Sequence, residues 1–220
     1  MIKKLTLIIG FIICLSSCGK DYVYRIEGEL SNLEDQTVYA VFEKDNYKVV
    51  DTVACTKPGQ FQIDQNEAGF HCVTIFFADK EHWVTAYLEP GETVKITGDA
   101  NSPLLLQVKG GRTNDKLAAF KKKIAPLLTE LTNLSNSLNS KDLNDTIEET
   151  DIAARLANVN MQLSEEAIRY VKENPNEEAS VVLIQSFFSD PDDTRKIDEL
   201  LALLNPRLKD FLSGKGAGAI

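Results

Sequence analysis

The side chains of this 220-residue chain that are best suited to chemistry are its four cysteines, Cys14, Cys18, Cys55 and Cys72. A thiol can act as a nucleophile, form a disulfide, bind a metal or accept an acyl group. Cys14 and Cys18 are separated by three residues in the stretch CLSSCGK, whereas the redox-active Cys-x-x-Cys arrangement has two. Disulfide exchange is therefore not predicted for this first pair, and its position in the chain suggests another role.

The residues before Cys18 are typical of an exported protein. Lys3 and Lys4 form a short cationic start, and the segment 5–15 is predominantly apolar. This order is that of a secretory signal peptide. The apolar run has about half of the ~20 residues that a membrane-spanning helix needs. We therefore expect a signal peptide over residues 1–17 rather than a transmembrane helix.

The segment LSSC at residues 15–18 resembles a bacterial lipobox, in which the cysteine thiol receives a diacylglyceryl group before cleavage. Several acyl chains at one residue, at ~0.8 kcal/mol per buried methylene, anchor a protein stably. We expect attachment to the membrane through a lipid on Cys18; an ordinary signal peptide with an incidental cysteine is the alternative. Gly19 follows, not the aspartate that retains lipoproteins in the inner membrane, so an outer-membrane location facing the periplasm is expected, with surface exposure left open.

The other two cysteines, Cys55 and Cys72, lie in segments that resemble strands. A disulfide can persist outside the cytosol, so a Cys55–Cys72 bond is one hypothesis. Two separate thiols that pack as small hydrophobic side chains are the other. The distance between the alpha carbons, which decides between them, cannot be read from the sequence. Neither cysteine belongs to a Cys-x-x-Cys motif, so no catalytic thiol is assigned.

The remaining candidate residues carry weaker signals. His71 and His82 are the only histidines, and strand alternation points His71 and Cys72 to opposite faces, so no zinc site is predicted. The run at 121–123 is interpreted as a solvated helix face with lysine stems over apolar surface. Aromatic side chains in neighbouring predicted strands could line a sugar- or peptide-binding face, although such residues are more often cross-strand pairs: Phe76, Phe77, Trp83 and Tyr87. No catalytic residue, metal or cofactor is assigned.

The charge of the chain excludes some partners. It has 24 basic and 33 acidic residues, a formal net charge of −9. Without a basic cluster, binding to nucleic acid and electrostatic attachment to anionic lipid are both disfavoured. Hydrophobic residues make up 43 %, enough for a core in one or two domains. The oligomeric state is left open.

Residues 18–111 are expected to form a β-domain. Apolar and polar residues alternate over short segments, and turn signals such as Lys57-Pro58-Gly59 separate them. Strands spaced by about 8–12 residues favour an antiparallel sandwich or partly open barrel of about 7–8 strands. The expected strands after the first, which starts near Tyr24, are 37–43, 48–55, 60–64, 70–78 (central in its sheet), 83–88, 93–97 and 104–108.

Residues 112–213 are expected to be helical, which makes the fold class α+β with the strands first. Apolar side chains at alternating spacings of three and four form a stripe: Leu117, Phe120, Ile124, Leu127, Leu131, Leu134 and Leu138. A second stripe comprises Ile152, Leu156, Val159, Leu163 and Tyr170. We expect an antiparallel helical hairpin, kinked at Pro126, with Thr113 as N-cap; an intermolecular coiled coil is the alternative. Short helices to 213 and a linker-like tail at 214–220 complete the chain.

Several turn-level motifs resemble a known family: Ile26-Glu27-Gly28, Gly59-Gln60-Phe61, Leu88-Glu89-Pro90-Gly91-Glu92, and Gly110-Gly111 followed by Asn114-Asp115. This pattern resembles the N-terminal domain of unknown function in lipoprotein thiol:disulfide interchange proteins of the TlpA/ResA type. Those proteins are typical of Gram-negative gut anaerobes. In that family a thioredoxin-fold domain with the catalytic Cys-x-x-Cys follows, and this chain has no such segment. The resemblance implies a non-catalytic accessory module that positions a redox domain or its partner.

Two other functions are compatible with the sequence. One is a stand-alone envelope lipoprotein that binds a protein or glycan through the sandwich or the hairpin. The other is a dimerisation scaffold in which the helical stripe is shared between chains. The partners expected are thus the membrane, through Cys18, and a thioredoxin-fold domain or other envelope protein.

Overall fold

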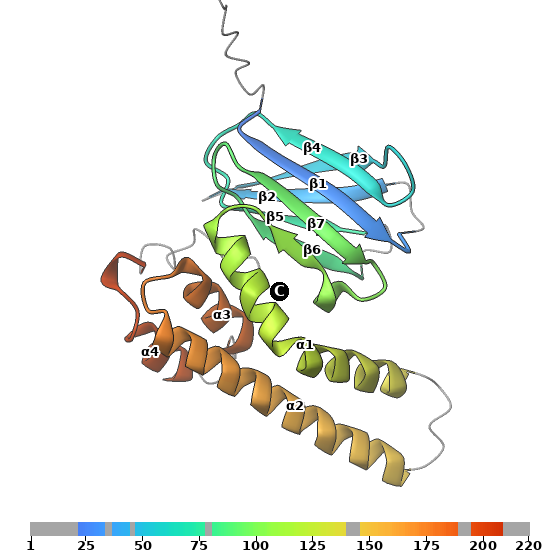
Figure 1. Cartoon of the computed structure of the whole chain (residues 1–220), viewed down its shortest axis with the longest axis vertical. Helices are drawn as coiled ribbons and strands as arrows, with labels where there is room; N and C mark the ends of the chain where they lie inside the picture. Colours follow the sequence, from blue (N-terminus) through green and yellow to red (C-terminus); the bar gives the residue numbers. More distant parts are fainter. Residues whose placement is uncertain are drawn as a thin grey trace, which may run out of the picture.

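The computed structural model describes residues 22–33, 37–44, 47–77, 81–139, 146–188 and 195–208. The expected signal peptide, Cys18 and the tail at 214–220 lie outside these residues. A β-sandwich forms one end of the described molecule and the helices form the other (Figure 1). The strands precede the helices, as the sequence predicts.

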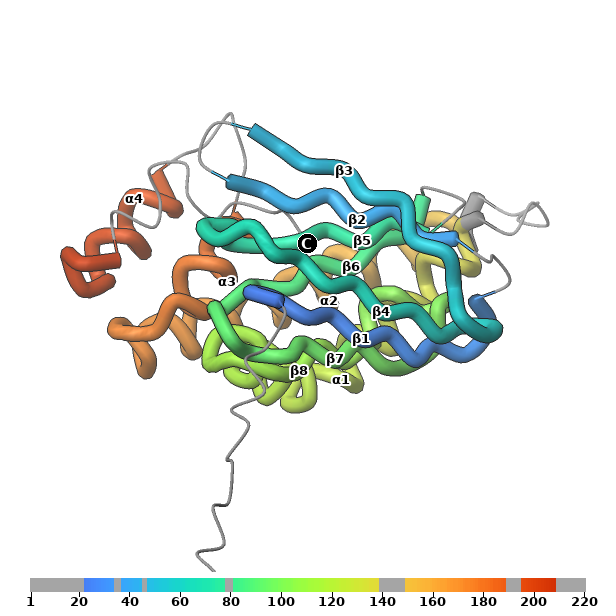
Figure 2. The backbone as a smooth tube through the Cα atoms, turned by 90° about the horizontal axis from the view of Figure 1, so that it is seen from above, coloured from blue at the N-terminus to red at the C-terminus, as the bar shows by residue number. Residues whose placement is uncertain are grey.

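The sandwich consists of two four-stranded sheets that are not closed into a barrel. The first has the order β4-β1-β7-β8, and its strands are Gln60–Gln65, Tyr24–Ser31, Thr93–Asp99 and Gln107–Lys109. The second has the order β3-β2-β5-β6, with strands Tyr47–Ala54, Thr37–Lys44, Cys72–Phe76 and Trp83–Tyr87. Figure 2 shows the strands of both sheets, with helices α1 and α2 behind them. Of the two architectures expected, the sandwich is therefore the one formed.

One strand pair departs from the antiparallel expectation. β1 and β7 are parallel, with Arg25 opposite Thr93 and Ser31 opposite Asp99. A parallel pair needs a long crossover connection. The crossover here is the whole chain between the two strands, which builds β4 and all four strands of the other sheet before it returns.

The core of the sandwich follows the strand alternation. Tyr24, Ile26 and Leu30 of β1 point inward, and each is at most 5 % exposed. Phe61 lies directly opposite Gly28, and a Cβ at Gly28 would meet the Phe61 ring at 2.2 Å. Two of the motifs noted in the sequence thus belong to one packing contact, in which the missing side chain of a glycine makes room for an aromatic ring.

The helices are α1 Arg112–Asn139, α2 Thr146–Glu173, α3 Glu178–Phe188 and α4 Arg195–Leu201, with short 3₁₀ helices at Pro103–Leu105 (η1) and Pro206–Leu208 (η2). α1 and α2 lie antiparallel, and α1 changes direction near its middle (Figure 1). Pro126 lies inside α1, where a proline removes a backbone hydrogen bond and kinks the helix. The predicted hairpin and its kink are confirmed.

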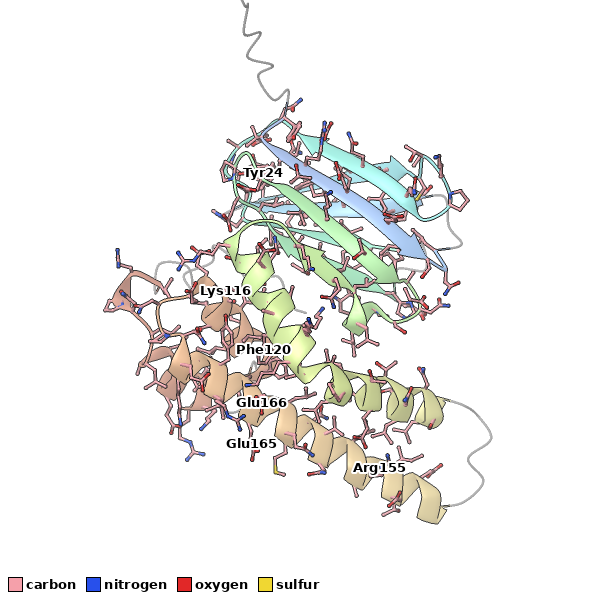
Figure 3. All side chains as sticks on the ribbon, in the orientation of Figure 1. Tyr24, Lys116, Phe120, Arg155, Glu165 and Glu166 are labelled. Carbon is pink, nitrogen blue, oxygen red and sulfur yellow. The ribbon has the colours of Figure 1, made fainter. Side chains whose placement is uncertain are left out.

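The two apolar stripes pack against each other within the chain. Phe120, Ile124 and Leu134 of α1 share one buried cluster with Val159 and Leu163 of α2. The ring of Phe120 lies 5.3 Å from that of Tyr170 and 6.4 Å from that of Phe187, so it is placed where α1, α2 and α3 meet (Figure 3). The stripe that could have served a coiled coil between two chains is used inside one chain.

Candidate functional site

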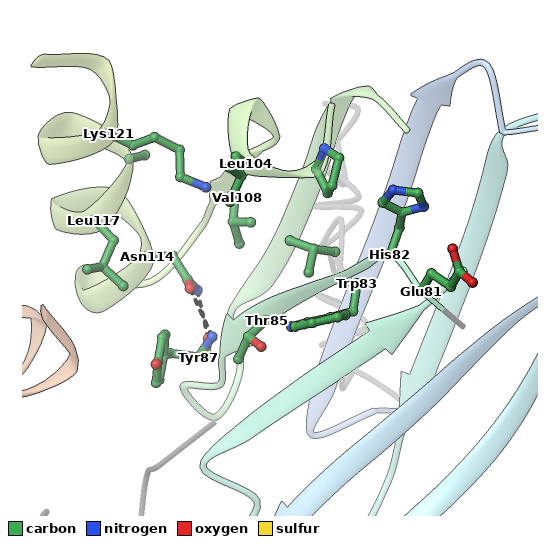
Figure 4. Close-up of a pocket in the computed structure, with 13 residues that line it drawn as sticks. Glu81, His82, Trp83, Thr85, Tyr87, Leu104, Val108, Asn114, Leu117 and Lys121 are labelled. Atoms are coloured by element: carbon green, nitrogen blue, oxygen red, sulfur yellow. Dashed lines mark hydrogen bonds between the residues drawn. The ribbon is translucent and has the colours of Figure 1, made fainter. Parts of the chain in front are cut away.

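A pocket of about 330 Å³ lies between the two open edges of the sandwich and helix α1. Strand β6 forms one wall, residues 103–108 form the second, and the first turns of α1 form the third (Figure 4). Ligand pockets in proteins have volumes of about 300–1,000 Å³. The pocket is thus large enough for a small ligand or for side chains of a peptide.

The position of α1 depends on the turn that precedes it. Gly110 has φ 101°, and a Cβ there would lie 2.0 Å from the carbonyl oxygen of Thr93. The Gly110 N–H donates to Asp115 Oδ1 at 2.9 Å, and the Thr113 N–H donates to Glu89 Oε1 at 3.2 Å. Carboxylates from two sides therefore satisfy backbone donors at the start of the helix.

The sequence prediction that Thr113 is the N-cap is wrong. The helix begins at Arg112, and the Thr113 hydroxyl donates instead to Glu178 Oε2 at 2.9 Å. Arg112 makes two 3.0 Å hydrogen bonds to the Glu177 carboxylate. These contacts tie α1 to the start of α3, and the capping role falls to Glu89 in the loop after β6.

Asn114 closes the edge of β6 at Tyr87. Its side-chain oxygen accepts from the Tyr87 N–H at 2.9 Å, and its side-chain nitrogen donates to the Tyr87 carbonyl at 2.7 Å (Figure 4). The same nitrogen donates to the Gly110 carbonyl at 2.7 Å. Asn114 is only 2 % exposed. One amide side chain thus pairs with the strand as a neighbouring strand residue would.

The rest of the β6 edge is open. The Phe77 N–H donates to His82 O and the Leu88 N–H donates to His71 O, so the even-numbered residues of β6 face β5. The backbone groups of Trp83 and Thr85 consequently face away from β5, toward the pocket side. Within the described part of the chain, no hydrogen bond is made to these outward N–H and C=O groups. An edge of this kind can accept another strand.

Lys121 supplies a positive charge to the pocket. Its Nζ donates to the Leu106 carbonyl at 3.1 Å, and no carboxylate among the described residues lies within ion-pair distance. Burial against apolar neighbours lowers the pKa of the Lys121 ammonium. The interpretation of the run 121–123 as a solvated face is therefore wrong for Lys121 and correct for exposed Lys122.

The aromatic residues singled out in the sequence do not form one binding face. Phe77 and Tyr87 are buried, at 2 % and 5 % exposure. Phe76 and Trp83 form a cross-strand pair with ring centroids 6.0 Å apart, and Trp83 is 40 % exposed beside the pocket. Only this second pair is available to a ligand.

Cys55 and Cys72 are not joined by a disulfide. Ala54, next to Cys55, lies opposite Thr37 at one end of β2, whereas Cys72 lies opposite Glu43 near the other end. Six residues of strand correspond to roughly 20 Å, far beyond the ~7 Å limit between bonded alpha carbons. The second hypothesis from the sequence, two separate thiols, describes the arrangement.

Cys72 is also unsuited to thiol chemistry. It is fully buried beneath Val182 of α3, next to Tyr87 and Leu117. Burial, and secondarily the Glu43 carboxylate at 3.8 Å from Sγ, raise the pKa of the Cys72 thiol to about 12. The nucleophilic thiolate is therefore scarce at neutral pH.

The histidines lie apart from any metal-binding arrangement in the described chain. His82 lines the pocket, and the His71 N–H donates to the Glu43 carbonyl. Within the described ranges, no three His, Cys, Asp or Glu side chains are grouped closely enough to hold a metal ion. None of the helices in those ranges is long and apolar enough to cross a membrane.

Comparison with known proteins identifies one domain. Residues 24–117 match the family described as "Domain of unknown function (DUF4369)". The match covers the whole sandwich, the Gly110 turn, Asn114 and Leu117, and so most of the pocket walls. Neither a curated protein nor a solved structure matches the chain.

Two residues of the site were missed in the sequence. Asn114 was noted only as part of a helix-opening motif, and Lys121 was grouped with its neighbours. A signal for Lys121 was present, because Leu117 and Lys121 are four residues apart and therefore share a helix face. For Asn114, the only local hint was a short amide side chain in the first turn of a helix that follows the pair Gly110-Gly111.

Proposed function

We propose that the chain is a non-catalytic, lipid-anchored module of the bacterial cell envelope that holds a partner protein in the pocket between β6 and α1. The observation that carries this proposal is the composition of the pocket. It combines an unpaired strand edge, apolar walls from Val108 and Leu117, and the ammonium group of Lys121. These groups can orient and bind a ligand.

The placement of the first strand supports an anchored module. In the view of Figures 1 and 3, Tyr24 begins β1 at the upper side of the sandwich, whereas the hairpin of α1 and α2 extends below the sandwich. The chain from Cys18 to Tyr22 has four Cα–Cα steps and reaches at most roughly 14 Å. A lipid on Cys18 would therefore hold the sandwich near the membrane, and the helical segment would project away from it.

The resemblance to accessory domains of thiol:disulfide interchange lipoproteins suggests the partner. We propose that the module positions a thioredoxin-fold domain or the protein on which that domain acts. The raised pKa of Cys72 supports a non-catalytic role, since thiol chemistry would have to come from the partner. In the alternative, a stand-alone lipoprotein uses the same pocket for another envelope protein or a glycan, which could stack on Trp83.

Two measurements test the proposal. In a Gram-negative host, radioactive palmitate should label the full chain but not the Cys18→Ala variant. In calorimetry, the processed chain should bind a thioredoxin-fold oxidoreductase from the same envelope. Leu104→Glu, which places a charge in the pocket, should weaken this binding at least about tenfold, as the burial of an unpaired charge implies. Leu203→Glu is the matched control, because Leu203 is 47 % exposed and does not line the pocket.

Three results would count against it. Absence of palmitate labelling would remove the anchor. Equal binding by Leu104→Glu and Leu203→Glu would remove the pocket from the interaction. Insulin reduction by the processed chain alone would contradict the non-catalytic role.

A further inference from the structure

We infer that the partner enters the pocket as an extended peptide that adds to the sheet along β6, with an acidic side chain of the peptide paired to Lys121. The inference rests on the proposed function and specifies the chemistry of what the pocket holds. Three features carry it: the pairing pattern of β6, the shape of the pocket and the local charge.

The first feature is the pattern of backbone groups along β6. Residues 83, 85 and 87 alternate with residues bonded to β5, so their N–H and C=O groups form one row along the edge. Asn114 occupies the Tyr87 position of this row with one donor and one acceptor. Two positions, Thr85 and Trp83, remain for a peptide, which would make the same two kinds of hydrogen bond there. Strand addition to an exposed edge is a common mode of peptide binding.

The second feature is the position of the apolar volume beside this edge. Leu117 and Ala118 of α1 and Val108 of the facing sheet line the pocket together with β6. Side chains of a strand alternate between its two faces. A peptide paired with Thr85 would therefore direct one set of side chains into the 330 Å³ volume and the other set past the exposed Trp83.

The third feature is charge. Lys121 is the only lysine or arginine among the described residues that line the pocket, and its ammonium group is directed into it (Figure 4). Among the described residues its Nζ is bonded to a neutral carbonyl and to no carboxylate, so the charge is available to a ligand. Glu81 lies at the opposite rim (Figure 4) and disfavours a second carboxylate there. The site thus selects an acidic side chain at the Lys121 end.

A phage-displayed library of random peptides provides the probe. Selection on the processed chain should enrich peptides rich in β-branched residues that contain Asp or Glu. One enriched peptide is then synthesised with both ends blocked, so that its acidic side chain is the only carboxylate. Replacing this residue by its amide should weaken binding about tenfold, the effect of one charge-assisted hydrogen bond.

Matched variants of the chain test each half of the inference. Thr85→Pro removes an outward N–H but no bond to β5, whereas Thr85→Val keeps the backbone donor; only the proline should weaken binding, by about tenfold. Lys121→Met should weaken binding of the acidic peptide, and Lys122→Met, an exposed neighbour, should not. If Thr85→Pro unfolds, backbone N-methylation of the peptide removes the complementary hydrogen bonds, which the peptide N–H groups donate to the outward carbonyls of β6, and should weaken binding by a similar factor.

Specific results would overturn the inference. The first is a selection that enriches no peptide. The second is equal binding by Thr85→Pro and Thr85→Val, together with a peptide whose affinity is unchanged by N-methylation. The third is equal binding of the acidic peptide by Lys121→Met and Lys122→Met. None of these changes the Leu104→Glu result with the partner protein. If that result holds while these tests fail, the pocket binds its partner by another mode, and the proposed function stands without strand addition.

Discussion

The two ends of strand β6 have opposite characters although they are only four residues apart. At Tyr87 the edge is covered by Asn114, the side chain is buried under α1 and α3, and the neighbouring Cys72 is inaccessible. At Trp83 the edge is unpaired and the indole is 40 % exposed beside the pocket, into which Lys121 points from α1 with no acidic partner among the described residues. We call these the closed end and the open end.

This difference separates the residues that hold the molecule together from those that can bind. Unpaired polar groups destabilise a fold when they are buried, so a protein normally pairs them. At the closed end every outward group of Tyr87 has a partner. The open end lies beside a pocket, where the same kinds of group can be paired by a ligand instead.

The largest difference between the ends is expected in thiol reactivity. With a pKa of about 12, the thiolate fraction of Cys72 at pH 8 is roughly a thousandfold or more below that of an ordinary cysteine. Iodoacetamide should therefore modify half-buried Cys55 and leave Cys72 unmodified until urea unfolds the chain. Mass spectrometry of peptides over time measures both rates. Equal rates for the two cysteines in the native protein would mean that the closed end opens readily.

The next largest effect is expected for Asn114→Ala. The substitution removes three hydrogen bonds and leaves the N–H and C=O of Tyr87 and the C=O of Gly110 without their partner. At about 1–3 kcal/mol for each unsatisfied buried group, less what water recovers, the free energy of unfolding should fall by roughly 3 kcal/mol. Asn133→Ala, at an exposed position of the same helix, should change it by less than about 0.5 kcal/mol. Urea denaturation compares the two variants, and similar midpoints would show that the Asn114 contacts contribute little.

Local patterns predicted much of this fold. The alternation in segments such as 24–30 and the stripe through Phe120 and Ile124 each reflect burial of one face, which depends on residues close in sequence. The parallel pairing of β1 with β7 could not be predicted in this way, because it joins segments more than sixty residues apart along the chain. Local propensity contains no information about which distant strand pairs with the edge of β1 that β4 leaves free.

The site was harder to predict than the fold for the same reason. Asn114 has its role only because the Gly110 turn brings α1 against the edge of β6. Lys121 differs from Lys122 only because η1 and β8 cover one side of the helix. The disulfide question was also decided by strand register, which places Cys55 and Cys72 at opposite ends of β2.

A smaller effect is expected from the charge of Lys121 on stability. Its pKa is lowered in the folded protein, so the folded state binds the proton less tightly than the unfolded state does. The resulting destabilisation is fully present below the folded pKa and disappears as the pH rises toward the unfolded value near 10.5. Lys121→Met should therefore stabilise the protein at pH 7, by no more than about 0.5 kcal/mol, and this gain should shrink by pH 10. Thermal unfolding at both pH values, with Lys122→Met as control, measures it; a gain that grew with pH would contradict the lowered pKa.

The smallest effect on stability is expected for Trp83→Phe at the open end. A phenyl ring preserves the cross-strand contact with Phe76, and the indole that it replaces is largely exposed, so the free energy of unfolding should change by only about 0.3 kcal/mol or less. Trp83 is the single tryptophan of the chain, and its fluorescence therefore reports on this end alone. Binding of the acidic peptide should shift the emission of Trp83 to shorter wavelength, because the peptide removes water from the indole. The Trp83→Phe variant should bind the peptide with an affinity within about threefold of that of the original chain. A large loss of stability in Trp83→Phe would make this residue part of the fold rather than of the binding edge, and the contrast between the two ends of β6 would then be smaller than the structure indicates.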